Sequence, residues 1–176
     1  MKVLIKKVTG IEIPKQANET DTGFDVIAVS PAKIVGEKID IFVDGLTLYS
    51  RIDYLEYETN LALACEKDLD YIQIFPRSSI STRNLMLKNS VAVIDNGFRN
   101  NIVLRFAYII QPENIHVLQE YGRNRCYVQI DQDKIYQQFQ KIAQIVAAKR
   151  IKIDFEFVDK LPDSQRGLNG LGSSGQ

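Results

Sequence analysis

The chain has 176 residues, 45% of them hydrophobic and 25% charged, which is the composition of one globular domain with its own core. Its 22 Lys and Arg residues balance 22 Asp and Glu residues. The net charge therefore excludes a global attraction to nucleic acid or to an anionic membrane, and a phosphate ligand must be held by local groups.

Cysteine and histidine are too few for the common zinc sites. Two cysteines exclude a tetrathiolate site, and the single His116 excludes paired-histidine motifs. The N-terminal sequence MKVLIKKVTG lacks the pattern of a signal peptide, and no apolar run is long enough to span a membrane. We therefore expect a cytoplasmic, reducing location, with Cys65 and Cys126 as buried small hydrophobes and His116 as a structural or surface residue.

Short segments rich in Val, Ile, Phe and Tyr predict β-strands along the whole chain. The last of them alternates, so that Ile151, Ile153, Phe155 and Phe157 share one face of a half-buried strand. Many short strands without regular helices between them favour a sandwich or barrel over a parallel α/β sheet. The segments are KVLIKKV (2–8), IDIFV (39–43), YIQIF (71–75), SVAVI (90–94), NIVLRFAYII (101–110) and IKIDFEFV (151–158).

Two segments have helical features. RSSISTRNLML (77–87) predicts a short helix with Ser78 or Ser79 as its N-cap. Further on, apolar residues recur at helical spacing over 132–148, and Asp131 is available as a cap, so the pattern alone predicts one helix there.

The remaining segments are polar. Residues 111–140 are interpreted as a loop or hairpin excursion from the single domain. VIDNGF, ending at Phe98, has the Asn-Gly signature of a hairpin turn. After Leu161 the apolar periodicity stops, so residues 162–176 are expected to be a mobile arm. RGLNGLGSS has the glycine spacing of a Walker loop, but Ser173 stands where that loop needs lysine.

Five segments, taken in order, resemble the five motifs of the homotrimeric dUTPase family over nearly the whole chain. The resemblance implies a distorted jelly-roll β-barrel (the dUTPase-like β-clip) over 1–161, with an insert at about 111–140 and one short helix after PRSS. It also implies a strand at 142–148, and a trimer in which the arm 162–176 closes over a neighbouring subunit's active site. The five segments are TDTGFDVIA (20–28), PRSSIS (76–81), NSVAVIDNGFRNN (89–101), QKIAQIVA (140–147) and RGLNGLGSSG (166–175).

The resemblance implies a role for particular residues. Asp95 matches the carboxylate that activates the attacking water, and Asp25 matches the aspartate that helps position a metal ion through water. The residues that match the uracil and deoxyribose site are Asn89, Phe98 and Leu171. Those that match the phosphate site are Arg77, Ser78, Ser79, Gln144, Arg166, Ser173 and Ser174.

The implied activity is hydrolysis of dUTP to dUMP and pyrophosphate, which limits uracil in DNA and supplies dUMP for dTTP synthesis. The residue chemistry agrees: Asp95 can accept a proton from water, and Arg166 can bind phosphate with a planar fork. The negative charges of the triphosphate outnumber the arginines, so Mg²⁺ is expected. The expected partners are dUTP and two further copies of the chain, and neither a membrane nor direct nucleic-acid binding is expected.

Five positions depart from the family pattern: Leu171 replaces a phenylalanine, Gln140 replaces an acidic residue, and Phe139, Ala92 and Asn100 stand where glycine is usual. A dCTP deaminase of the same fold is an alternative, but its catalytic glutamate would fall at Arg105, and arginine cannot shuttle a proton at neutral pH. A regulatory or binding protein is another alternative. Its contact site would be the insert 111–140, for which a tolerated surface insertion is the simpler explanation.

Overall fold

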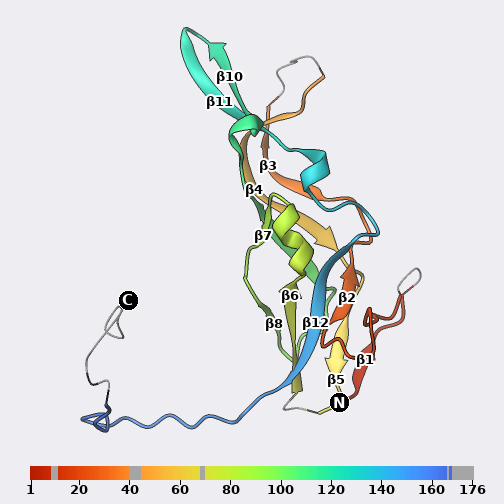
Figure 1. The fold of residues 1–176 in the computed structure, drawn as a ribbon, viewed down its shortest axis with the longest axis vertical. Coiled ribbons are helices and arrows are strands. Elements are labelled where there is room, and N and C mark those ends of the chain that lie inside the picture. Colours follow the sequence, from red (N-terminus) through yellow and green to blue (C-terminus); the bar gives the residue numbers. More distant parts are fainter. Residues whose placement is uncertain (9–11, 40–44, 68–69, 166, 168–176) are drawn as a thin grey trace.

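The computed structural model describes residues 1–8, 12–39, 45–67, 70–165 and 167. These residues form twelve strands and three short 3-10 helices (Figure 1). None of the described helices is long and apolar enough to cross a membrane. The elements are β1 Val3–Ile5, β2 Phe24–Ile27, β3 Lys33–Lys38, β4 Leu48–Glu58, β5 Leu63–Cys65, β6 Asp70–Pro76, η1 Ser78–Thr82, β7 Leu85–Leu87, β8 Ala92–Ile94, β9 Val103–Tyr108, η2 Pro112–Asn114, β10 Ile115–Glu120, β11 Arg123–Gln129, η3 Gln132–Lys134 and β12 Lys141–Lys149.

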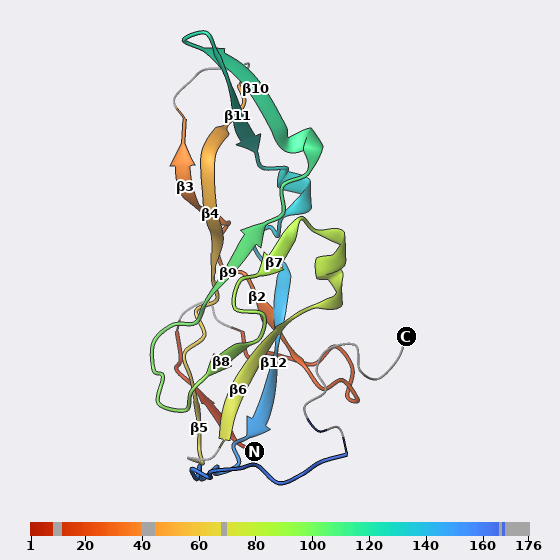
Figure 2. The same ribbon diagram turned by 90° about the vertical axis from the view of Figure 1, so that its left-hand side faces the viewer.

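The strands form three antiparallel sheets. The largest has the order β10-β11-β4-β9-β7, with β3 also paired to β4. A four-stranded sheet has the order β2-β12-β6-β8, and β1 pairs with β5. Most neighbours in these sheets are distant in sequence, and Figure 2 shows β9 and β7 beside the strands of the second sheet. The all-β prediction is confirmed.

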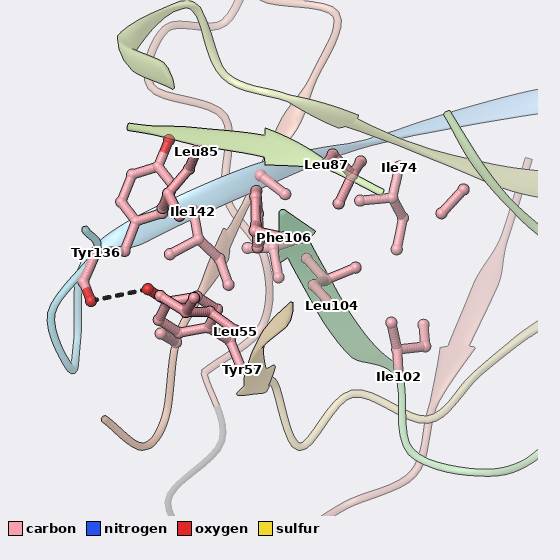
Figure 3. Packing of buried hydrophobic residues seen from close by; sticks show 14 of the residues in the cluster. Leu55, Tyr57, Ile74, Leu85, Leu87, Ile102, Leu104, Phe106, Tyr136 and Ile142 are labelled. Carbon is pink, nitrogen blue, oxygen red and sulfur yellow. Dashed lines mark hydrogen bonds between the residues drawn. The ribbon is translucent and has the colours of Figure 1, made fainter. Parts of the chain in front are cut away.

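The core fills the space between the two larger sheets. Leu55 and Tyr57 of β4 and Leu104 and Phe106 of β9 alternate inward, as half-buried strands do. Three aromatic rings, those of Tyr57, Phe106 and Tyr136, meet edge to face with centroids 5.6 to 6.3 Å apart. The Tyr57 hydroxyl donates to the carbonyl oxygen of Tyr136 at 3.1 Å (Figure 3). Burial raises the pKa of Tyr57, so the hydroxyl stays protonated and can donate.

The predicted strands are largely present, with one exception. KVLIKKV, SVAVI and NIVLRFAYII contain β1, β8 and β9, and YIQIF lies within β6, which extends one residue further at each end. Most of IDIFV lies outside the described residues. The half-buried strand at 151–158 is wrong: β12 ends at Lys149, and the following residues form no strand and are exposed, Phe155 at 92%. The alternating sequence of residues 151–158 would give a strand one apolar face, but no strand in the described part of this chain pairs with this segment.

The two helical segments differ from their patterns. Ser78–Thr82 form the 3-10 element η1, whose cap position is Arg77, without a side-chain hydrogen bond, so the serine cap is wrong. The long helix is absent: Gln132–Lys134 form η3, with Asp131 accepting from the amide of Asp133 at 2.9 Å, and Lys141–Lys149 form β12. β12 is bonded on both sides, to β2 and β6, and this pairing outweighs the helical spacing.

The excursion 111–140 contains a hairpin. β10 and β11 pair over their full length, and β11 joins the large sheet at Val128, opposite Tyr49. Figure 1 shows the hairpin extending beyond the body of the protein. His116 is structural, since its Nε2 lies 2.9 Å from Oε1 of Gln129. Cys65 is buried as expected, whereas Cys126 on β11 is exposed, which corrects the prediction.

Candidate active site

Three segments far apart in the sequence meet at the sheet β2-β12-β6. Gln144 of β12 is in register with Asp25 on one side and with Phe75 on the other. Arg77 follows the end of β6, and its Nε lies 2.9 Å from Oδ1 of Asp25. The structure therefore brings together Asp25, Arg77 and Gln144, which the sequence assigned to three different motifs.

Besides Arg77, a second basic side chain contacts the carboxylate of Asp25. Lys141 Nζ lies 2.7 Å from Oδ2 of Asp25. That oxygen is buried and accepts no well-directed hydrogen bond among the described residues, so we treat the contact as an ion pair. The sequence reasoning missed Lys141, although it lies inside the segment QKIAQIVA.

Gly23 lets Gln144 approach the backbone of the first motif. A Cβ at position 23 would lie 2.3 Å from Oε1 of Gln144, which is closer than any real contact. The amide Nε2 of Gln144 lies 3.4 Å from the carbonyl oxygen of Pro76. The Gln144 side chain is thus confined between Gly23, which precedes β2, and Pro76, the last residue of β6.

Asp95 lies at a turn that other groups hold in place. The amide of Phe98 donates to the Asp95 carbonyl at 2.9 Å. The Asn96 side chain accepts from the Cys65 amide at 2.7 Å and donates to the Lys67 carbonyl at 3.2 Å. The turn is not the tip of a simple hairpin, because β8 pairs with β6 while β9 pairs with β4 and β7. It presents the Asp95 carboxylate to solvent.

The candidate residues line three separate hollows. Asp95 lines one of about 640 Å³, which we call the Asp95 hollow. Asn89 and Phe98 together line a second hollow of about 490 Å³, the Asn89 hollow. Asp25 lines a third of about 600 Å³ with Phe139 and Lys141.

The Asn89 hollow contains residues that the motifs did not indicate. Tyr54 of β4, Lys88 after β7 and Arg105 of β9 contribute to its wall. Lys88 Nζ lies 5.5 Å and Arg105 Cζ 4.6 Å from the centre of the Tyr54 ring. The alternation of a strand indicates only that such residues point outward. It does not indicate that residues of different strands line the same hollow.

Most of the arm lies outside the residues that the structure describes. The predicted phosphate- and base-site residues Arg166, Leu171, Ser173 and Ser174 lie outside the described residues. The segment that leads to them, 150–165, is described and exposed throughout.

Known proteins with a similar sequence align with nearly the whole chain. No family model matches it. A deoxyuridine 5'-triphosphate nucleotidohydrolase (dUTPase) of Gloeothece citriformis is 26% identical over 174 residues, which cover 96% of this chain and 95% of that protein. A dUTPase of Helicobacter pylori strain P12 is 25% identical over 177 residues, 99% of this chain and 97% of that protein. This chain is similar to dUTPases over nearly its whole length.

Solved dUTPases share the fold. The dUTPase of Staphylococcus bacteriophage 80alpha, solved with dUpNHpp, has a TM-score of 0.68 at 17% identity and covers 99% of each chain. A mutant dUTPase of phage phi11 of S. aureus has a TM-score of 0.60 at 14% identity over 91% of this chain and 98% of that one. That structure describes the coordination of a structural Mg(II) ion. The expected dUTPase-like β-barrel is confirmed.

The described residues do not by themselves form a magnesium site. No group of three or more His, Cys, Asp or Glu side chains in that part of the chain could hold a metal ion. Asp25, the expected metal-positioning residue, already has two cations within 3 Å, at Arg77 and Lys141. Its charge is thereby offset, so it does not fit as a direct ligand, and its contact through water stays a prediction.

Proposed function

We propose that this chain is a dUTP diphosphatase, which hydrolyses dUTP to dUMP and pyrophosphate and so limits uracil in DNA and supplies dUMP for dTTP synthesis. The observation that carries the proposal is the alignment of 96% of the chain with a protein named deoxyuridine 5'-triphosphate nucleotidohydrolase. The occurrence of Asp25, Arg77 and Gln144 in one cluster supports it, because these side chains come from three of the five motifs.

Asp95 accepts the proton of the water that attacks the α-phosphate. The turn that carries Asp95 is anchored through the Asn96 side chain and through the backbone of Phe98. The exposed carboxylate is therefore available to the attacking water. A positioned general base contributes about 10² to 10⁴ in rate.

Phosphate groups are held by donors from two regions. Arg77, Ser78, Ser79 and Gln144 belong to the barrel. The ion pair of Arg77 Nε with Asp25 fixes that guanidinium and leaves its terminal nitrogens for phosphate oxygens. Arg166, Ser173 and Ser174 of the arm add further donors.

Uracil and deoxyribose bind in the Asn89 hollow, against Asn89 and Phe98, with Leu171 of the arm covering the base. Phe98 lies under the sugar and leaves no room for a 2′-hydroxyl. Uracil offers an N3–H donor and an O4 acceptor, and cytosine reverses both, so a site that pairs the first pattern leaves buried groups unpaired with the second.

The active form is a homotrimer with shared sites. Two features of the single chain support this. The motif residues line separate hollows, so one subunit does not enclose a nucleotide with all of them. Residues 151–158 expose Ile151, Ile153, Phe155 and Phe157, which is unfavourable unless a neighbouring subunit covers them.

Mg²⁺ accompanies the nucleotide. The described part of the barrel offers no cluster of three or more His, Cys, Asp or Glu side chains, so the nucleotide itself would supply protein-independent oxygen ligands to the ion. When bound, it neutralises phosphate charge. Turnover should stop with a chelator, while the unfolding transition of the nucleotide-free protein stays unchanged.

The β10–β11 hairpin, within the insert 111–140, is a contact site for a protein partner in a reducing, cytoplasmic location. Its outward face exposes Ile115, Val117 and Cys126, and Tyr121 at the tip is 99% exposed. Such a face adds nothing to the core of the single chain.

Pyrophosphate release from dUTP, dTTP, dCTP and UTP, each with Mg²⁺, tests the proposed activity. We expect release from dUTP, with the other nucleotides slower by orders of magnitude. Equal turnover of all four nucleotides would contradict the proposal. Release of ammonia from dCTP would replace it with a deaminase.

A further inference from the structure

We propose that Arg105 is a specificity-determining residue, whose guanidinium donates to a carbonyl oxygen of the pyrimidine and so favours uracil over cytosine. The inference rests on the proposed function, since it concerns the base of the nucleotide that the Asn89 hollow takes. The inference assigns the preference for uracil over cytosine to one side chain, whereas the motif residues do not indicate which side chain of the hollow determines it.

The position of Arg105 is defined by the sheet. Arg105 of β9 is in register with Glu56 of β4, and its Nε lies 2.9 Å from Oε2 of that carboxylate. The guanidinium carbon lies 4.6 Å from the centre of the Tyr54 ring. An ion pair on one side and an aromatic ring on the other hold the planar group in one orientation.

Arg105 also lies where the base is proposed to bind. It lines the same hollow as Asn89 and Phe98, which belong to the third motif. The amide of Lys88, the residue before Asn89, donates to the Arg105 carbonyl at 3.0 Å. The segment that leads into Asn89 therefore lies directly beside this arginine, and Phe98 lines the same hollow.

The chemistry of the group restricts what it can recognise. A guanidinium only donates hydrogen bonds, and it is always charged. The hydrogen bond with Glu56 raises the pKa of Arg105 further. Nε serves Glu56, and the described residues include no hydrogen-bond partner for the terminal nitrogens. These nitrogens match O4 of uracil and oppose the amino group that cytosine carries at the same position.

A solvated ion pair on the outer face of a sheet is the alternative, and the chain contains one for comparison. Arg51 of β4 contacts Asp53 at 3.0 Å and has a side chain 64% exposed, against 55% for Arg105. Arg51 does not line the Asn89 hollow. Arg51→Met therefore removes a similar arginine and a similar ion pair without changing the proposed base site.

The experiment compares kcat/KM for dUTP, dCTP and UTP in the full-length protein and in Arg105→Met, Arg105→Lys and Arg51→Met. Loss of a charge-assisted hydrogen bond should lower the value for dUTP by about 10- to 100-fold in Arg105→Met. The value for dCTP should stay within about threefold, so the dUTP/dCTP preference falls. Arg105→Lys, which keeps the charge but loses the fork, should fall between, and Arg51→Met should match the unsubstituted protein.

The dUTP/UTP ratio separates base reading from general damage. It should stay constant in Arg105→Met, because the sugar is read by Phe98. A parallel loss for all three nucleotides, or an unchanged dUTP/dCTP ratio, overturns the inference, and the first of these results would mean a phosphate or structural role. Thermal unfolding of each variant shows whether it is folded.

Failure of the proposed function would be recognised separately, as absence of dUTP turnover by the unsubstituted protein. Equilibrium binding of dUMP and dCMP then measures the base preference without turnover. A preference for dUMP that Arg105→Met removes supports the role of Arg105, and equal binding of the two by the unsubstituted protein overturns it.

Discussion

The side chain of Asp95 is exposed, and other groups hold the turn that carries it. The turn depends on the Asp95 carbonyl, which accepts from Phe98, and on the Asn96 side chain, which bonds the backbone of Cys65 and Lys67. Replacing the carboxylate therefore changes the chemistry of the site while leaving its shape.

Asp95→Asn should keep dUTP binding and lower turnover by about 10² to 10⁴, since an amide does not accept the proton. Pyrophosphate release and equilibrium binding of a non-hydrolysable dUTP analogue measure the two effects. Asp53→Asn, which removes an exposed carboxylate paired with Arg51, is the control and should change neither. Near-normal turnover in Asp95→Asn would remove Asp95 from the mechanism.

Tyr57 stabilises the core through its hydroxyl as well as its ring. Tyr57→Phe keeps the ring contacts but leaves the buried Tyr136 carbonyl without its donor. We expect the free energy of unfolding to fall by about 1 to 3 kcal/mol. Urea denaturation measures it, with Tyr121→Phe at the exposed hairpin tip as the control. Equal stability of the two variants would mean that the hydrogen bond contributes nothing.

At the scale of elements, Gly23 before β2 closely approaches Gln144 of β12, which is proposed to bind phosphate. Gly23→Ala would put a Cβ against the end of Gln144, a flexible group that can move away. We expect turnover to fall by about 10- to 100-fold through misplacement of this side chain. Unfolding should change little, and calorimetry alongside kinetics tests the separation. Normal turnover would exclude Gln144 from the phosphate site.

The β10–β11 hairpin is joined to the body through few contacts, since β11 pairs with β4 only at Val128 and Gln129. Replacing Leu118–Arg125 by Asn-Gly would connect the paired residues Val117 and Cys126 through a two-residue turn. We expect unchanged turnover and an unchanged trimer mass by light scattering. Loss of assembly would make the hairpin structural and count against its role as a partner site.

At the scale of the whole molecule, we expect the segment after β12 to contribute separately to assembly and to catalysis. Residues 151–158 carry exposed apolar side chains, and the proposed phosphate-binding residues of the arm follow Lys160. Truncation after Lys160 should therefore leave a folded trimer with little activity. Native mass spectrometry and pyrophosphate release check the two halves of this expectation. A truncated protein with normal turnover would show that the arm is only a tail.

Much of the fold was predictable from local patterns, because alternation and β-branched composition mark strands such as β6 and β9 directly. The helix over 132–148 was wrong on pattern alone because spacing reports which residues share a face, but not which strand lies beside them. The neighbours of β12 are about 70 and about 120 residues away. A window along the chain does not contain them.

By itself the sequence indicated the all-β class and, through the order of its five motifs, the resemblance to dUTPases and the residues to examine. Only the tertiary structure decided that Asp25 contacts Arg77 and Lys141, that Arg105 shares a hollow with Asn89, and that residues 151–158 have no partner within the described chain. The physical reason is that motif and periodicity are properties of neighbouring residues, whereas ion pairs, hollows and unpaired strands are set by non-local sheet pairing.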